Sequence, residues 1–226
     1  SFLKLQGKEM PKDYSFLGFA PIFERGDRFS SNVRTLDFMT DSLYRSISNN
    51  GFVALINTKK EVETIAQLLK SKGQTKTLID KAATKTNLSQ YLETQPYQFI
   101  HIATHGLVNY KNPKLSALAC HSENENSEEL LYANEIQFKE INADLVVLSS
   151  CESGIGQLVV GEGLIALNRS FIYAGAKNVL FSLWKVSDKY SSELMIDFYK
   201  NYLKGQSYTT ALRNAKLKML ENSASA

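Results

Sequence analysis

The sequence predicts an α/β fold in which a mostly parallel central sheet carries helices on both faces. Segments with the composition of strands alternate along the chain with segments of helical periodicity, which is typical of this fold class. The later strands, at 97–104, 143–150 and 178–184, are continuous apolar runs, as expected for strands covered on both faces. The chain has 226 residues and 43% hydrophobic content, enough for one core and too little for two. We therefore expect a single domain over residues 1–226.

The first quarter of the chain is predicted to hold one strand and a long irregular stretch. Residues 14–22 have the composition of a strand, which Pro21 ends. Residues 23–51 are polar and only weakly periodic, which predicts a surface insertion, with a short helix near 37–45 as an alternative. Residues 52–57 fit a short edge strand or a loop.

The first clear helix is predicted at 58–73. Thr58 can cap it, and Glu61 follows at the capping-box spacing. Gly73 supplies a stop signal. The apolar face of this helix is formed by Val62, Ile65, Ala66 and Leu69. A strand at 75–80 and a helix at 84–95 follow, and the inward residues of that helix are Leu88, Tyr91 and Leu92.

The second half of the chain continues the alternation. Residues 117–136 are predicted to form a small hairpin with a polar, acidic tip at 122–129, followed by a helical turn. Three helices are expected after the strand at 143–150, with stops at Gly175 and Gly205 and a cap at Ser207. Their inward side chains are predicted to be Leu164, Leu167, Phe171 and Ile172, then Leu194, Phe198 and Tyr202, then Tyr208, Leu212, Ala215 and Met219.

Charge and composition exclude several classes of function. The net charge is +3 and the pI is about 8.7, with both signs interspersed, so no nucleic-acid-binding stripe is indicated. Two cysteines in a chain of this size indicate a reducing compartment, and we expect a cytoplasmic location. The stretch SFLKLQGKEMPKDY has no basic region followed by an apolar run, so we do not expect it to be a signal peptide. No run reaches about 18 apolar residues, so no membrane partner is expected. The abrupt start at Ser1, without methionine, suggests a domain of a longer protein.

Two predicted strands end in residues that could carry chemistry. "FIHIATHG" places His105 just past one strand, and "LVVLSSCESG" places Cys151 just past another. The loops beyond the carboxyl ends of parallel strands are where such sheets bind ligands. A cysteine beside a histidine is the minimal nucleophile–base pair for acyl transfer. The backbone N–H groups of Gly106 and of Cys151 are placed to stabilise an oxyanion.

Each residue also has a purely structural interpretation. A single cysteine at a strand end is usually a small packing residue, and a single histidine there is usually a satisfied structural one. From the residues alone, catalysis and packing are about equally supported. The conjunction of His105 and Cys151 at two strand ends, each before a glycine-containing loop, is what favours a site.

The two motifs together resemble the signature pair of the CHAT proteases, which are caspase-like cysteine peptidases related to separases and caspases. The resemblance covers most of the chain and is poorest between residues 23 and 50. Other segments that resemble the family in the same order are "LGFAPI" (17–22), "EVETIAQLL" (61–69), "ATKTNL" (83–88), "PKLSAL" (113–118), residues 161–188 and residues 202–217.

This resemblance implies a caspase-like α/β sandwich and a cysteine endopeptidase with His105 and Cys151 as its dyad. It implies a protein or peptide substrate and neither a metal nor an organic cofactor. Domains of the family commonly follow helical repeats, so a regulatory protein or an N-terminal repeat domain is an expected partner.

For four other polar residues we prefer a structural interpretation. His101 lies four residues before His105, but within a strand that spacing separates the two along the strand by about 13 Å, so His101 is expected to be structural. Cys120 and His121 lack the second pair that a zinc site needs. Glu152 is expected to anchor its loop rather than to orient His105.

Asp188 and Trp184 are the candidate substrate-binding residues. In the related separases, an acid in a similar stretch receives a basic side chain before the scissile bond, which implies that Asp188 could select arginine or lysine and that Trp184 could wall the pocket. The stronger interpretation is structural, because Ser187 and Asp188 precede a predicted helix and suit its N-terminus.

Three functions are therefore open at this point. The first is a cysteine endopeptidase, which forms a thioester acyl-enzyme on Cys151 with His105 as base and then acid. The second is a catalytically silent interaction module on the same scaffold, a pseudo-protease. The third is a different thiol-based acyl transferase or hydrolase.

Overall fold

A wholly parallel sheet of five strands forms the centre of the molecule, in the order β3-β1-β4-β8-β9. The computed structural model describes residues 15–23, 28–29, 52, 55–109, 112–121, 127–149, 162–182 and 187–224. The strands of the central sheet are β1 (Phe16–Ala20), β3 (Thr75–Ile79), β4 (Tyr97–Ile102), β8 (Ala143–Leu148) and β9 (Val179–Phe181). β4 lies in the middle, and its predicted burial on both faces is confirmed.

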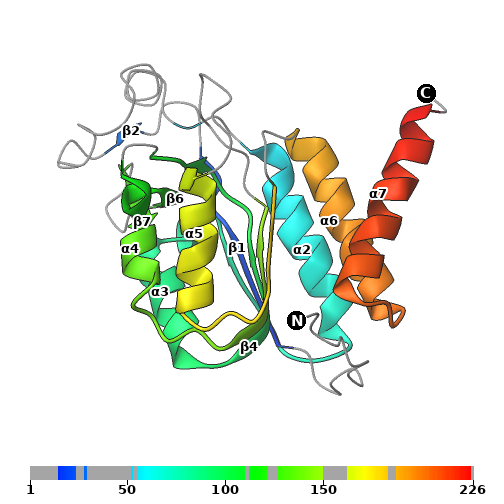
Figure 1. Ribbon diagram of the computed structural model, residues 1–226, viewed down its shortest axis with the longest axis horizontal. Coiled ribbons are helices and arrows are strands. Elements are labelled where there is room, and N and C mark those ends of the chain that lie inside the picture. The colour runs from blue at the N-terminus through cyan, green and yellow to red at the C-terminus, as the bar shows by residue number, and fades with distance from the viewer. Residues whose placement is uncertain are drawn as a thin grey trace.

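Helices cover both faces of this sheet, so the predicted α/β sandwich is confirmed (Figure 1). One face carries α2 (Ile56–Lys70), α6 (Asp188–Leu203) and α7 (Tyr208–Ala224). The other carries α3 (Lys85–Thr94), the single-turn α4 (Ala133–Ile136) and α5 (Glu162–Tyr173). Two short 3-10 helices, η2 (Asp80–Ala82) and η3 (Pro113–Leu115), connect elements on this second side.

A smaller sheet lies beside the carboxyl edge of the central one, in the order β2-β7-β6-β5. It contains the predicted hairpin, whose strands are β6 (Ala117–His121) and β7 (Ser127–Tyr132). β5 (Gly106–Leu107) pairs antiparallel with β6, and β2 (Arg28–Phe29) pairs parallel with β7. Because β5 begins immediately after His105, this small sheet continues the backbone that leaves β4.

Alternation along β4 divides the core into two layers. Phe99 packs toward α2 and α6, with Ile65, Leu69, Phe198 and Tyr199. Ile100 and Ile102 pack toward α3, α4 and α5, with Leu88, Ile136 and Phe171. Successive side chains of a strand point to opposite faces, which is why one continuous apolar run serves both layers.

The start of α2 differs from its prediction. The helix begins at Ile56 rather than after Thr58. Residues 56–57 are therefore helical, and the expected edge strand or loop at 52–57 is wrong there. The Thr58 hydroxyl donates to the carbonyl of Leu55 at 2.8 Å instead of capping the helix. Glu61 does not close a capping box, because its carboxylate turns inward to His101. Glu61 thus bonds to His101, 40 positions away in sequence, instead of to the backbone at the start of its own helix.

The other helices largely follow their predicted bounds. Thr84 caps α3 by accepting from the Asn87 N–H at 3.1 Å, and Ser207 caps α7 by accepting from the Thr210 N–H at 3.2 Å. Leu167 and Phe171 of α5 are buried as expected, whereas Ile172 is 46% exposed, so its predicted burial is wrong. Most of the predicted insertion at 23–51 and of the hairpin tip lies outside the described residues.

Two helices end at glycines with a positive φ, Gly175 and Gly205. The space around the missing Cβ is filled at the first glycine and open at the second. Gly175 has φ +112°, and a Cβ placed there would clash with the backbone carbonyl oxygen of Ile141. Gly205 has φ +89° with open space around the same position. Gly205→Ala is expected to cost about 1–2 kcal/mol of unfolding free energy from backbone strain alone.

Gly175→Ala should cost clearly more than Gly205→Ala, because the clash with backbone is added to the strain. Urea denaturation of both variants measures the difference. Equal losses in the two variants would show that the contact with Ile141 carries no weight.

Candidate functional site at the carboxyl edge of the sheet

His105 lies three residues beyond the end of β4, and its backbone is held from two sides. The Ala103 N–H donates to the carbonyl of Phe19 at 2.8 Å, which extends the pairing with β1. The Thr104 hydroxyl donates to the carbonyl of Ala119 at 2.7 Å, and the Ala119 N–H donates to the carbonyl of His105 at 3.0 Å. The histidine is therefore fixed between the central sheet and the small sheet.

The imidazole of His105 is packed among aromatic rings. It stacks on Phe52 with ring centroids 4.9 Å apart and an interplanar angle of 13°. Phe23 contacts it at a centroid distance of 5.6 Å, and the two phenylalanines contact each other at 4.8 Å. The residue is only 3% exposed. These contacts fix the plane of the ring.

Gly106 is the residue after His105, and its backbone N–H points away from β6. It lies opposite Leu118 in the β5–β6 ladder. Because the Ala119 N–H bonds to His105, Gly106 and Leu118 form a pair that is not hydrogen-bonded to each other. The N–H groups of such a pair point away from the partner strand, so β6 does not use the Gly106 N–H.

The strand that leads to Cys151 ends beside β4. β8 pairs parallel with β4, with Leu148 opposite Ile102. The Ser149 N–H donates to the carbonyl of Ile102 at 2.9 Å, and its hydroxyl lies 3.3 Å from the hydroxyl of Ser191 in α6. Ser149 and His105 therefore leave adjacent strands at the same edge. Cys151 itself, Glu152 and Trp184 lie outside the described residues.

Asp188 lies at this edge as the first residue of α6, where its carboxylate binds α2. Its Oδ2 accepts from the backbone N–H of Asn57 at 2.9 Å and from the Asn57 side-chain amide at 2.7 Å. Asn57 is the second residue of α2, and Leu55, the N-cap, provides no side-chain bond. Asp188 thus caps α2 from outside, which satisfies an N–H that would otherwise lack a partner.

His101 belongs to a buried cluster on the α2–α6 face of the sheet. Its Nε2 lies 2.8 Å from Glu61 Oε1, and its Nδ1 lies 3.4 Å from the hydroxyl of Tyr199. All three side chains are at most 1% exposed. Burial, and then electrostatic interaction with Tyr208 and Glu61, raises the pKa of Tyr199 well above its ordinary value. This cluster gives His101 the structural role that its strand position predicts.

Cys120 is unsuited to nucleophilic chemistry. It is completely buried in β6, and this burial raises the pKa of its thiol far above the ordinary value. Its neighbour His121 has Nε2 2.7 Å from the carbonyl of Ile22. Within the described part of the chain, no three histidine, cysteine or acidic side chains gather as a metal site.

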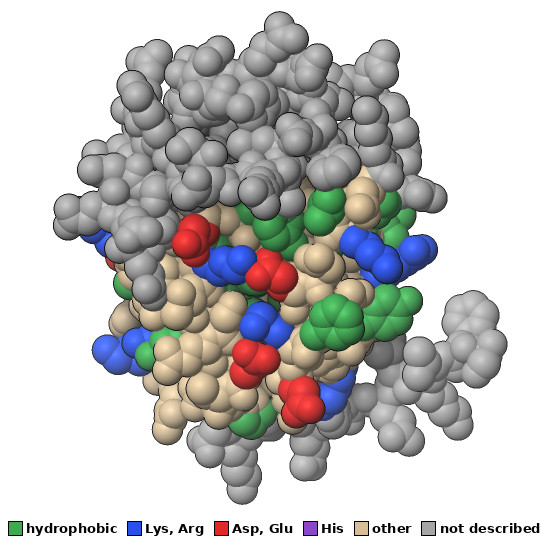
Figure 2. Space-filling model, turned by 90° about the vertical axis from the view of Figure 1, so that its left-hand side faces the viewer, with side chains coloured by type: hydrophobic (Ala, Val, Ile, Leu, Met, Phe, Trp, Pro, Cys, Tyr) green, Lys and Arg blue, Asp and Glu red, His purple; other side chains and the backbone are tan. Residues whose placement is uncertain are grey.

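The surface over α3 and α4 mixes charges of both signs, as Figure 2 shows for the described side chains. Lys85 pairs with Glu135 at 2.7 Å, and Lys139 pairs with Glu93 at 3.1 Å. The described side chains of this face therefore form no continuous basic patch. None of the described helices is long and apolar enough to span a membrane.

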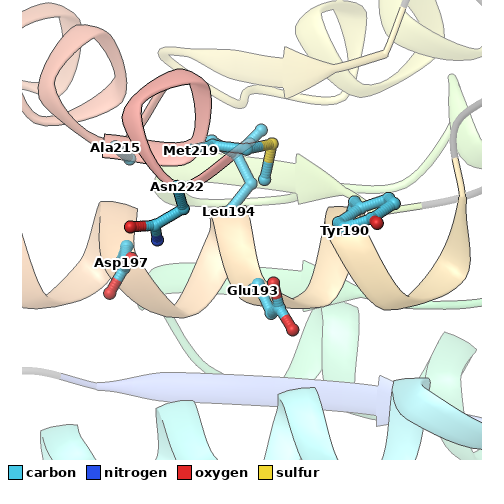
Figure 3. A pocket seen from close by; sticks show the side chains of 7 residues that line it. All are labelled: Tyr190, Glu193, Leu194, Asp197, Ala215, Met219 and Asn222. Atoms are coloured by element: carbon cyan, nitrogen blue, oxygen red, sulfur yellow. The ribbon is translucent and has the colours of Figure 1, made fainter. Parts of the chain in front are cut away.

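A groove of about 240 Å³ separates α6 from α7 (Figure 3). Apolar and polar side chains line it, among them Tyr190, Glu193, Leu194, Asp197, Met219 and Asn222. Asp197 is already paired with Lys218 across the two helices at 2.8 Å. None of the described residues that line the groove is a cysteine or a histidine, so His105 is not part of it.

A parallel sandwich with a histidine at its carboxyl edge, beside the strand that leads to a cysteine, has the architecture of the caspase-like sandwich proteins. The profile of the CHAT domain family matches residues 26–226. The chain belongs to the CHAT domain family.

Two curated relatives share part of the sequence. Tetratricopeptide repeat protein 28 of Mus musculus is 36% identical over 96 residues, which is 42% of this chain and 4% of that protein. The protein of the same name from Homo sapiens has the same identity and coverage. The chain therefore spans only a small part of the length of these relatives.

Sequence reasoning did not identify Phe23, Phe52, Asn57 or Ser191 at this edge. Phe52 and Asn57 fell in a stretch predicted as an edge strand or loop, and aromatic or amide side chains there carry no motif. Only the folded chain brings Asn57 to Asp188, 131 positions away.

The buried state of Cys120 gives a direct chemical test. In native protein Cys120 should resist iodoacetamide at neutral pH, because its neutral thiol is out of reach of the reagent. After denaturation it should be alkylated readily. Mass spectrometry of tryptic peptides distinguishes the two cysteines of the chain. Rapid labelling of Cys120 in native protein would contradict the burial described above.

Proposed function

We propose that this domain is a cysteine endopeptidase with His105 and Cys151 as its catalytic dyad. His105 accepts the proton of the Cys151 thiol, and the thiolate attacks the carbonyl carbon of a peptide bond. The N–H groups of Gly106 and Cys151 bind the oxyanion. His105 then donates its proton to the departing amine, and water, activated by the same imidazole, hydrolyses the thioester. No cofactor takes part in these steps.

The proposal rests chiefly on the pairing of β4 with β8. The Ser149 N–H bond to the carbonyl of Ile102 brings the two strand ends together, with His105 after one and Cys151 after the other. The orientation of the Gly106 N–H away from β6 supports the proposed oxyanion site. Membership of the CHAT family supports the same chemistry.

The burial of His105 favours one alternative, a silent interaction module. A base that is 3% exposed and stacked on Phe52 is poorly placed to receive a substrate without rearrangement. A different thiol-based acyl transferase would share the dyad but not the substrate. Turnover of a mixed peptide library separates these: cleavage supports the peptidase, transfer to an added amine without hydrolysis supports the transferase, and neither supports the module.

The domain is proposed to act within a longer protein that contains helical repeats. The named relatives are tetratricopeptide repeat proteins of which this chain matches 4%. A regulatory protein or the repeats themselves would then control access to the site. We place this peptidase in the cytoplasm, since its cysteine content suits a reducing compartment.

Replacing either member of the dyad should abolish peptide cleavage while the fold survives. Cys151→Ala and His105→Ala are each expected to lower kcat/KM by on the order of 10³-fold or more, because the nucleophile or its base is lost. Circular dichroism and thermal unfolding check the fold. Cys120→Ala is the matched control and should retain cleavage. Loss of activity in Cys120→Ala alone would overturn the assignment of Cys151.

Asp188 is proposed to select a basic side chain before the scissile bond, with Trp184 as a wall of the same pocket. Asp188 lies at the carboxyl edge, and Oδ1 accepts no hydrogen bond from any of the described residues, since both bonds from Asn57 go to Oδ2. One oxygen is thus structural and the other is available to a guanidinium or ammonium group.

Asp188→Asn separates the structural role of this residue from selectivity. The amide oxygen can still accept from Asn57, so stability should fall by less than in Asp188→Ala, which is expected to lose about 1 kcal/mol as an uncapped helix does. Cleavage after arginine should fall about 10-fold or more, because the charge is gone. Rates for peptides with arginine and with glutamine measure this. If the Asp188→Asn variant prefers arginine over glutamine as strongly as wild type does, the proposed pocket is wrong.

A further inference from the structure

Phe52 and Asn57, which lie just before and at the start of α2, contact both halves of the proposed site. Phe52 stacks on His105 with centroids 4.9 Å apart, and Asn57 binds Asp188 through two hydrogen bonds of 2.9 and 2.7 Å. Only five positions separate Phe52 and Asn57 in sequence. His105 and Asp188 are by contrast far apart in sequence, the first beyond the end of β4 and the second at the start of α6. Two residues close together in sequence thus contact both of them.

We propose that Phe52 and Asn57 are positioning residues, Phe52 for the imidazole of His105 and Asn57 for the carboxylate of Asp188. The inference deepens the proposed function and rests on it. Neither Phe52 nor Asn57 belongs to a catalytic motif. One would orient the proposed base, His105, and the other would orient Asp188, which is proposed to select the substrate.

The geometry of Phe52 suits the first task. A near-parallel stack with an interplanar angle of 13° restricts rotation of the imidazole about its side-chain bonds. Phe23 contacts the same imidazole at an angle of 39° and also contacts Phe52, so the rings form one packed group. A flexible aliphatic side chain at position 52 would fill part of the space but would not hold the plane.

The geometry of Asn57 suits the second task. Its backbone N–H and its side-chain amide converge on the same oxygen of Asp188, which fixes the carboxylate in direction as well as in place. Glu61 is one turn further along the same face of α2 and is bound to His101 at 2.8 Å. The start of α2 is therefore itself anchored to the central strand, which gives Asn57 a rigid base.

The two tasks predict different kinetic signatures. Phe52→Leu should lower kcat on the order of 10- to 100-fold for all peptides, with little change in KM, because a misplaced base slows every reaction equally. Asn57→Ala should lower kcat/KM roughly 3- to 10-fold for peptides with arginine and leave those with glutamine unchanged, because one bond to Asp188 is lost.

Matched controls exist in the chain. Phe99→Leu truncates a similarly buried ring that contacts Tyr199 rather than His105. Asn87→Ala removes an asparagine from the first turn of α3, where its amide donates to the carbonyl of Ala82 and its N–H to Thr84. Phe52→Tyr keeps the ring and should restore kcat. The two controls, Phe99→Leu and Asn87→Ala, should fold and cleave as wild type does, apart from lower stability.

Two measurements on the same 226-residue chain do not depend on turnover. The chain has three histidines, and the ring contacts of His101 and His121 are with Phe16, Tyr199 and Phe23 rather than with Phe52. In NMR spectra, Phe52→Leu should move the carbon-bound ring protons of His105 downfield and leave those of His101 in place. By calorimetry, N-acetylargininamide should bind Asn57→Ala more weakly than wild type, with N-acetylcitrullinamide as the neutral probe.

The outcomes decide each part. Unmoved His105 signals, or a loss of kcat in Phe99→Leu equal to that in Phe52→Leu, overturn the role of Phe52. Equal loss for arginine and glutamine peptides, or unchanged binding of N-acetylargininamide, overturns the role of Asn57. If wild type cleaves nothing, the proposed function fails, while the NMR and calorimetric results still decide the positioning of His105 and Asp188.

Discussion

The bond between Glu61 and His101 is the contact on which the arrangement of the edge depends. It joins α2 to the central strand at 2.8 Å, and the Tyr199 hydroxyl at 3.4 Å adds α6 to the same histidine. All three groups are buried, so removing His101 would take this hydrogen-bond partner from both Glu61 and Tyr199 in the core. Because the bond fixes the rotation of α2 on the sheet, it also fixes where Asn57, one turn earlier, meets α6.

Strand pairing then brings the chemistry of the edge together. β4 lies between β1 and β8, and the bonds of Ala103 to Phe19 and of Ser149 to Ile102 carry that pairing past the formal strand ends. The small sheet adds a further constraint, since β6 binds the carbonyl of His105. The position of the histidine therefore follows from backbone hydrogen bonds, while the orientation of its ring follows from Phe52 and Phe23.

Asp188 shows how one residue can satisfy a structural need and remain available for binding. Its Oδ2 caps α2, which has no side-chain cap of its own, and this requirement alone would justify an acid there. The proposed selectivity concerns the other oxygen. A similar division holds for the two cysteines, because the burial that raises the pKa of the Cys120 thiol makes it a packing residue. That leaves Cys151 as the candidate nucleophile.

The sequence by itself determined the α/β class, the central strands, the hairpin and the helix ends at Gly175 and Gly205, because periodicity and backbone conformation are local properties. It also singled out His105 and Gly106 through their motif, whereas the roles of these residues and of Cys151, Trp184 and Asp188 remain predictions. Only the tertiary structure decided that Glu61 faces His101 rather than its own helix terminus, that α2 begins at Ile56, and that Ile172 is exposed. Those outcomes depend on partners distant in sequence, whose side chains compete with local hydrogen bonds and are brought within reach only when the helices pack on the sheet.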